Sequence, residues 1–174
     1  MTLSPSAESP RRLALPDNLL SWLDAAELVA IISEASSATS WPGRADERRP
    51  DLEALLVVVT SFYAIGLYSS QDIERSLARE EDPGLLVDIP SADWKTIYWF
   101  RRRHRGAVRQ CLARVFAEAW RRHQHRVVLD DPAHDSFAGT SLWLSDLPSQ
   151  GFFEVAADER LQRAMMADSV ALDD

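Results

Sequence analysis

The sequence predicts an all-α protein: a small helical bundle that holds a trihelical, helix-turn-helix-like unit and ends in an acidic, partly irregular tail. Two observations support this class. Apolar residues recur every three or four positions in successive segments, which is the spacing of one helix face. The charge is also strongly divided, because the chain has a net charge of -8 while Trp94 to Arg126 holds ten basic residues and one acidic residue.

The composition predicts one main domain. The chain has 174 residues, of which 46% are hydrophobic, enough for a substantial core. We expect a disordered lead-in over residues 1–16, a helical DNA-binding-like domain over 17–126 and an acidic segment with one short helix over 127–174. Because the sequence shows neither a long apolar span nor a signal pattern, we expect a soluble, cytoplasmic protein.

The first two helices are predicted from their periodicity. Residues 18–35 repeat leucine, alanine and isoleucine at helical spacing, and Asp17 is expected to cap this helix. A connector rich in Ser, Pro and Gly follows, in which Trp41 is expected to cover the core. In residues 51–66 the run L-L-V-V-V alone would suit a strand, but the periodic length after Pro50 favours a buried helix.

A short third helix is predicted after Ser69. This serine stands three residues before Asp72, which is typical of a helix N-terminus, and the D-P-G sequence at 82–84 is the expected end. Residues 85–89 suit either a turn of helix or an extended link. With the helices on either side, this short helix forms a helix-turn-helix-like order whose connector is longer than in the tight motif.

The basic segment 94–126 has two faces at 100° per residue. His104 and Cys111 fall on the apolar face, so we interpret both as core residues. Asp93 is the expected N-cap, and Gly106 is a point at which the segment could divide into two helices. Arginine-rich helices are often merely solvated, but the density of bases here favours phosphate binding. The residues expected to face DNA are Lys95, Thr96, Trp99, Arg102, Arg103, Arg105 and Arg109.

The segment 127–174 is acidic, with ten acids and two bases. Its leucine and aromatic residues, among them Trp143, Phe152 and Phe153, predict that part of it docks on the bundle. Residues 156–167 can form one short helix. The acidic side chains could simply be solvated, or they could lie against the basic face and compete with nucleic acid.

Three fragments, in order, resemble a known family. They are R-P-D-L at 49–52, G-L-Y-S-S-Q-D-I-E at 66–74 and T-I-x-x-F-R-R-R-H at 96–104. Together they resemble the amino-terminal helical domain of bacterial insertion-sequence DDE transposases, over roughly residues 50–120. The resemblance implies that the domain engages double-stranded DNA at transposon ends.

The catalytic chemistry of that family is not expected here. By the resemblance, residues 127–131 would form the strand that bears the first catalytic Asp, but Asp131 precedes Pro132 rather than Gly-Thr. The residues that follow are too few for the rest of an RNase H-like sheet, so we expect no enzymatic activity and no cofactor. The histidines at 123, 125 and 134 with Asp130 and Asp131 match no strong ligand spacing, so we expect no metal site.

Two functional hypotheses follow. The first is a non-catalytic DNA-binding domain in a bacterial, nucleoid-associated protein. The alternative is a protein-interaction or regulatory module, which forms a homodimer or binds a full-length transposase. The acidic tail and the number of aromatic side chains motivate the alternative.

Overall fold

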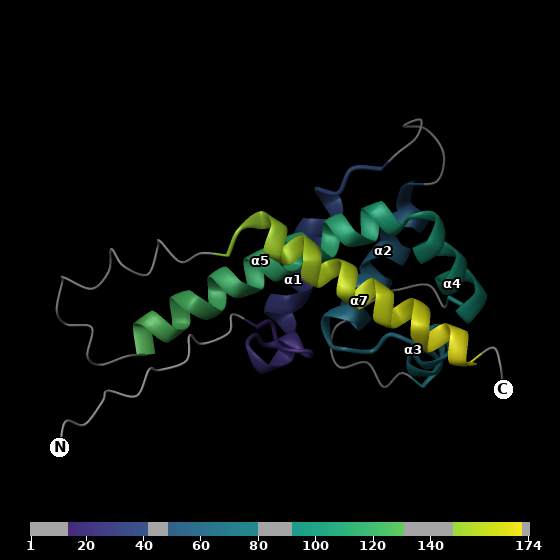
Figure 1. Cartoon of the computed structure of the whole chain (residues 1–174), viewed down its shortest axis with the longest axis horizontal. Coiled ribbons are helices and arrows are strands. Elements are labelled where there is room, and N and C mark those ends of the chain that lie inside the picture. Colours follow the sequence, from purple (N-terminus) through teal and green to yellow (C-terminus); the bar gives the residue numbers. More distant parts are fainter. Residues whose placement is uncertain (1–13, 42–48, 80–91, 131–147, 172–174) are drawn as a thin grey trace, which may run out of the picture.

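The computed structural model describes residues 14–41, 49–79, 92–130 and 148–171. Within these ranges every regular element is helical, which confirms the predicted all-α class. The elements are the 3₁₀ helix η1 (Leu19–Ser21) and the helices α1 (Ala25–Ser37), α2 (Arg49–Ala64), α3 (Ser70–Ala78), α4 (Trp94–Arg103), α5 (Arg105–Asp130) and α7 (Gln150–Ala171). In Figure 1, α5 and α7 run along the long axis, and α3 and α4 lie together at one end.

The first helical region differs from the prediction of one helix capped by Asp17. Asn18 instead caps the short η1, and Asp24 caps α1. The Glu27 N–H donates to Asp24 Oδ1 at 2.8 Å and the Asp24 N–H donates to Glu27 Oε2 at 3.1 Å. This reciprocal pair is a capping box, whose D-x-x-E pattern was present in the sequence. Asp17 forms an ion pair with Arg163 of α7 instead.

The run L-L-V-V-V belongs to α2, so the helical interpretation of this segment is confirmed. Leu56, Val59 and Phe62 are buried in the core. After α2 ends, Gly66 has a φ of 87°, and a Cβ atom there would lie 3.1 Å from the Asp17 carbonyl oxygen. Glycine suits this turn because L residues with a side chain rarely adopt positive φ.

The two caps predicted for the helix-turn-helix-like unit are present. Ser69 Oγ accepts the Asp72 N–H at 3.4 Å, and Asp93 Oδ1 accepts the Thr96 N–H at 2.6 Å. Helix α3 packs against α4, and α4 packs against α2. The predicted end of the third helix at 82–84 and the open stretch 85–89 lie outside the described residues.

The basic segment divides into α4 and α5 at His104 rather than at Gly106. His104 has φ -114° and ψ 30° and ends α4, whereas Gly106 lies in the first turn of α5. Helix α5 then continues through Val127 to Asp130. The transposase resemblance implied a strand over residues 127–131. For residues 127–130 this expectation is wrong, because they extend a helix that is packed along most of its length.

Helix α7 has 22 residues and is longer than the short helix predicted over 156–167. Its residues Phe153, Ala157, Leu161 and Ala164 are buried, at the three- and four-residue spacing of one helix face. This face packs against α5, and the tip of α7 reaches α3. The end of the chain thus supplies one wall of the core. Trp143 lies outside the described residues.

Candidate nucleic-acid interface

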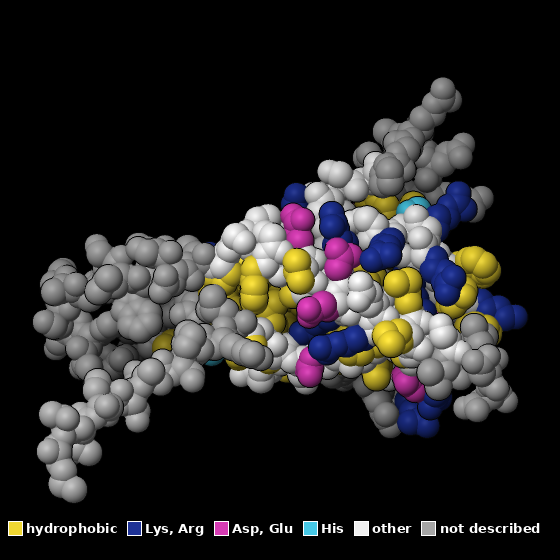
Figure 2. All heavy atoms as spheres, viewed as in Figure 1, with side chains coloured by type: hydrophobic (Ala, Val, Ile, Leu, Met, Phe, Trp, Pro, Cys, Tyr) yellow, Lys and Arg dark blue, Asp and Glu magenta, His cyan; other side chains and the backbone are white. Residues whose placement is uncertain are grey.

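Helix α4 presents one face to the core and the other to solvent. Ile97 and Phe100 are buried, while Trp99 is 64% exposed. Lys95, Arg102 and Arg103 are exposed on the same side as Trp99. In Figure 2, dark-blue side chains gather at the end of the molecule occupied by α4, whereas over α7 they alternate with magenta carboxylates.

The seven predicted site residues fall on two helices. Five of them lie on α4, and all five are exposed: Lys95, Thr96, Trp99, Arg102 and Arg103. The other two, Arg105 and Arg109, lie on the first two turns of α5 and are also exposed. The break at His104 therefore separates the predicted face into two parts with different surroundings.

Two exposed cations of α4, Lys95 and Arg102, contact aromatic rings. The Arg102 guanidinium carbon lies 4.4 Å from the centroid of Tyr98, and Lys95 Nζ lies 5.7 Å from that of Trp94. Among the described residues, no carboxylate forms an ion pair with Lys95, Arg102 or Arg103. Stacking fixes a guanidinium without neutralising it, so the positive charge stays available to a polyanion.

The cations of α5 are shared with α7. Arg105 Nη2 lies 3.2 Å from Asp158 Oδ1, and Arg109 Nη1 lies 3.2 Å from Asp158 Oδ2. Both arginine side chains remain more than 40% exposed, at 47% and 45%. Ion pairs of this exposure are weak and screened by salt, so a polyanion could compete for the same arginines.

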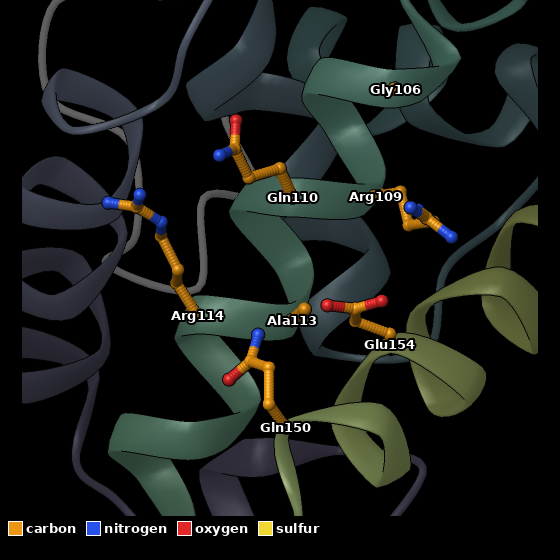
Figure 3. Close-up of a pocket in the computed structure, with 7 residues that line it drawn as sticks. All are labelled: Gly106, Arg109, Gln110, Ala113, Arg114, Gln150 and Glu154. Atoms are coloured by element: carbon orange, nitrogen blue, oxygen red, sulfur yellow. The ribbon is translucent and has the colours of Figure 1, made fainter.

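A groove of about 310 Å³ lies beside these pairs, between α5 and α7. In Figure 3 the carboxylate of Glu154 extends from α7 toward α5, and Glu154 and Arg109 both line the groove. Arg114 and Gln150 line the same groove. Asp158 of α7 thus lies against the basic residues at the start of α5, as one of the two alternatives for the acidic segment expected, whereas its competition with nucleic acid stays a prediction.

Arg101 belongs to the core, although it is one of the run of bases at 101–103. It is 1% exposed and forms an ion pair with buried Asp168 of α7. Its Nη1 also donates to Tyr63 Oη at 3.1 Å and to the Ala164 carbonyl at 2.8 Å. Burial raises the pKa of Tyr63 to about 12, so its hydroxyl stays protonated. The burial of Arg101 could have been inferred from the sequence, because Arg101 follows Ile97 by four residues and this spacing places it on the apolar face of the helix.

Asp168 joins this network to α3. Its Oδ1 accepts the Ser70 N–H at 2.8 Å, and its Oδ2 accepts the Ser70 hydroxyl at 2.7 Å. A carboxylate at the N-terminus of a helix is stabilised by the free N–H groups and the helix dipole. The network therefore holds α3 and α4 in place against α7, and nothing in the local sequence pattern pairs Arg101 with Asp168.

Arg160 is a second buried arginine. It is 4% exposed, and its Nη1 donates to the Ala64 carbonyl at 3.2 Å and also to the Tyr63 carbonyl at the end of α2. Its guanidinium lies 4.6 Å from the centroid of Phe116, and burial lowers its pKa. A cation at the C-terminus of a helix satisfies carbonyls that lack helical partners. Arg160 thus fastens α7 to α2.

His104 and Cys111 have the surroundings expected of core residues. His104 is partly buried, and its ring centroid lies 5.5 Å from that of Trp41. The pKa of His104 is lowered mainly by burial and further by the positive charge of Arg103. Trp41 packs against the core, as predicted. Cys111 is buried, and burial raises the pKa of its thiol. A cysteine buried in this way is structural rather than reactive.

No cluster of three metal-ligating side chains occurs in the part of the chain that the structure describes. Asp131 and His134 of the histidine-containing group considered above lie outside it. Among the described helices, none is long and apolar enough to cross a membrane. Comparisons of the chain with protein-family models, with curated proteins and with solved structures found no match.

Proposed function

We propose that the chain is a non-catalytic DNA-binding protein and that the exposed face of α4 is its principal contact surface. One observation carries the proposal: Lys95, Arg102 and Arg103 surround an exposed Trp99, and no described carboxylate forms an ion pair with any of the three. Such a face attracts the phosphate backbone by releasing counterions. The resemblance of roughly residues 50–120 to transposase amino-terminal domains supports transposon ends as the target.

Arg105 and Arg109 extend this face along α5. Their shared partner, Asp158, has a side chain that is 32% exposed, so solvent and salt reach the pairs. A DNA phosphodiester carries one negative charge, like Asp158, and Arg can bind it bidentately, but its neutralisation also releases condensed counterions. In the proposed complex these two arginines exchange Asp158 for phosphate. The exposed cations of α4 bind phosphate without giving up an ion pair to a described carboxylate.

The test is the salt dependence of binding to labelled double-stranded DNA, measured by fluorescence anisotropy. A purely electrostatic face gives a slope of about 0.9 in log K against log salt for each phosphate neutralised. The substitutions Arg102→Gln and Arg103→Gln should each weaken binding and reduce the slope by about 0.9. Random and transposon-end duplexes of equal length compare the non-specific and the specific component.

Arg121→Gln is the matched control. Arg121 is exposed at 67% and lies in the second half of α5, where it pairs with Glu118. Its removal changes the net charge of the protein by the same amount but lies away from α4. Equal losses from Arg121→Gln and Arg102→Gln would show attraction without a defined face. Absence of binding at low salt would overturn the proposal, and light scattering on the same samples would then test the alternative of a homodimer.

A further inference from the structure

Trp99 stands at the centre of the cationic face rather than at its edge. At 100° per residue, Lys95 and Arg102 fall within about 60° of Trp99 on one side of it, and Thr96 and Arg103 fall within about 60° on the other. The indole is 64% exposed and makes a T-shaped contact with the ring of Tyr98, with centroids 5.3 Å apart and planes at 85°. A large apolar ring is therefore held in solvent among cations.

The chemistry of an indole limits what it can recognise in DNA. It has one N–H donor and no acceptor, so it reads little of the hydrogen-bonding pattern at base edges in an intact groove. What it offers is a flat π surface, which stacks on the face of a base. In an intact duplex those faces are covered by neighbouring base pairs, and they are accessible at unpaired bases, at open ends and at kinked steps.

The neighbouring Tyr98 does not offer the same surface. The guanidinium of Arg102 lies 4.4 Å from its centroid and that of Arg101 lies 5.6 Å away, so cations already occupy its ring. Because Arg101 is fixed by Asp168 and Ala164, Tyr98 and the backbone of this turn are held firmly. Trp99 is thus projected from a rigid turn, which reduces the entropy lost when the ring stacks.

We infer that this site prefers DNA with unpaired or unstacked bases over closed duplex, with Trp99 stacking on a base while Lys95, Arg102 and Arg103 hold the flanking phosphates. This inference rests on the proposed function, and it names the form of DNA that the same face takes. Cations around an aromatic platform are the combination used for single-stranded nucleic acid, where stacking tolerates many sequences.

The experiment compares full-length protein on three labelled DNAs of equal length: a duplex closed by hairpins, the same duplex with a central stretch of mismatches, and a single strand. Wild-type protein should bind the second and third more tightly than the first. Trp99→Ala should weaken binding to these two by about 5- to 150-fold, the effect of losing one stacked base, and binding to the closed duplex by less than about 3-fold.

Three further variants separate stacking from other roles of the side chain. Trp99→Phe keeps an aromatic ring and should retain most of the preference, whereas Trp99→Leu keeps an apolar surface and should lose it. Met166→Ala removes an equally exposed apolar side chain from α7, where Met166 is 70% exposed, and should change nothing. Circular dichroism and thermal unfolding establish that all variants are folded.

The outcomes distinguish this inference from the proposed function. Equal affinity for all three DNAs, or equal losses on all three in Trp99→Ala, would overturn the inference and leave α4 as a duplex-binding face. Trp99→Leu behaving like wild type would do the same. If Trp99→Ala abolished a concentration-dependent dimer seen by light scattering but left DNA binding unchanged, Trp99 would belong to a protein interface. Absence of any DNA binding would overturn both proposals.

Discussion

Arg101 and Arg102 are adjacent in the sequence and differ in almost every physical respect. Arg101 is buried and bound by Asp168, Tyr63 and backbone carbonyls, while Arg102 is exposed and stacks on Tyr98. One residue step turns a helix by about 100°, which is enough to move a side chain from the core to solvent. A run of bases is therefore not one functional unit, and each member has to be placed by its helix face.

The same comparison extends to the two helices of the basic segment. Lys95 and Arg102 of α4 have aromatic neighbours, whereas the arginines at the start of α5 share Asp158 of α7. Substitution of a buried arginine such as Arg101 should therefore change the stability of the protein. Substitution of an exposed arginine such as Arg102 should change DNA binding.

The largest expected effect is that of Arg101→Ala. This substitution leaves Asp168 buried without its cationic partner, and loss of one member of a buried pair costs about 3–5 kcal/mol. Urea unfolding should show this loss, whereas Arg102→Ala should change stability by less than about 0.5 kcal/mol. Similar stabilities for the two variants would contradict the difference in burial. The double variant with Asp168→Ala should lose less than the sum of the single losses.

The second prediction concerns α7 as a wall of the core. Leu161→Ala removes a side chain that is 1% exposed and should lower the free energy of unfolding by about 2–5 kcal/mol. Val155 lies on the outer side of α7 at 60% exposure, so Val155→Ala is the control and should be nearly neutral. Thermal unfolding gives the comparison. A neutral Leu161→Ala would mean that α7 is a dispensable tail.

The third prediction concerns the shared carboxylate. Asp158→Asn should change stability by less than about 1 kcal/mol, because its pairs are exposed. It should tighten DNA binding, because Arg105 and Arg109 no longer give up a carboxylate when they bind phosphate, and it should leave the salt slope near the wild-type value. Glu159→Gln, an adjacent exposed position on α7, removes the same charge and is the control. Equal effects from both substitutions would indicate general charge repulsion rather than competition for Arg105 and Arg109.

The smallest expected effect is on pH dependence. Burial lowers the pKa of His104 and of His123, which stacks on Trp22 with ring centroids 4.3 Å apart. The unfolded chain therefore binds more protons than the native protein below about pH 6.5, and stability should fall as the pH falls through this value. The melting temperature at pH 7.5 and 5.5 measures the effect. Replacing both histidines with Gln should reduce the difference between the two temperatures.

Local signals predicted much of the fold. The caps at Ser69 and Asp93 and the helical nature of α2 follow from residues within a few positions of one another. The assignment of Asp17 as a cap failed because the stronger capping box of Asp24 and Glu27 lies seven residues further on. The C-terminal end of α7 was placed too early because Asp168 interrupts its apolar face with a charge that only tertiary contacts satisfy.

The sequence by itself determined where the main helices form and that a dense set of bases follows Asp93, because periodicity and capping act over one or two turns. Tertiary structure decided which bases are available. Arg101 meets a carboxylate 67 residues away, Arg105 meets one 53 residues away, and Arg102 and Arg103 form no ion pair among the described residues. The cost of burying a charge depends on partners brought together only by packing, so the pattern of free and paired arginines is a property of the folded bundle.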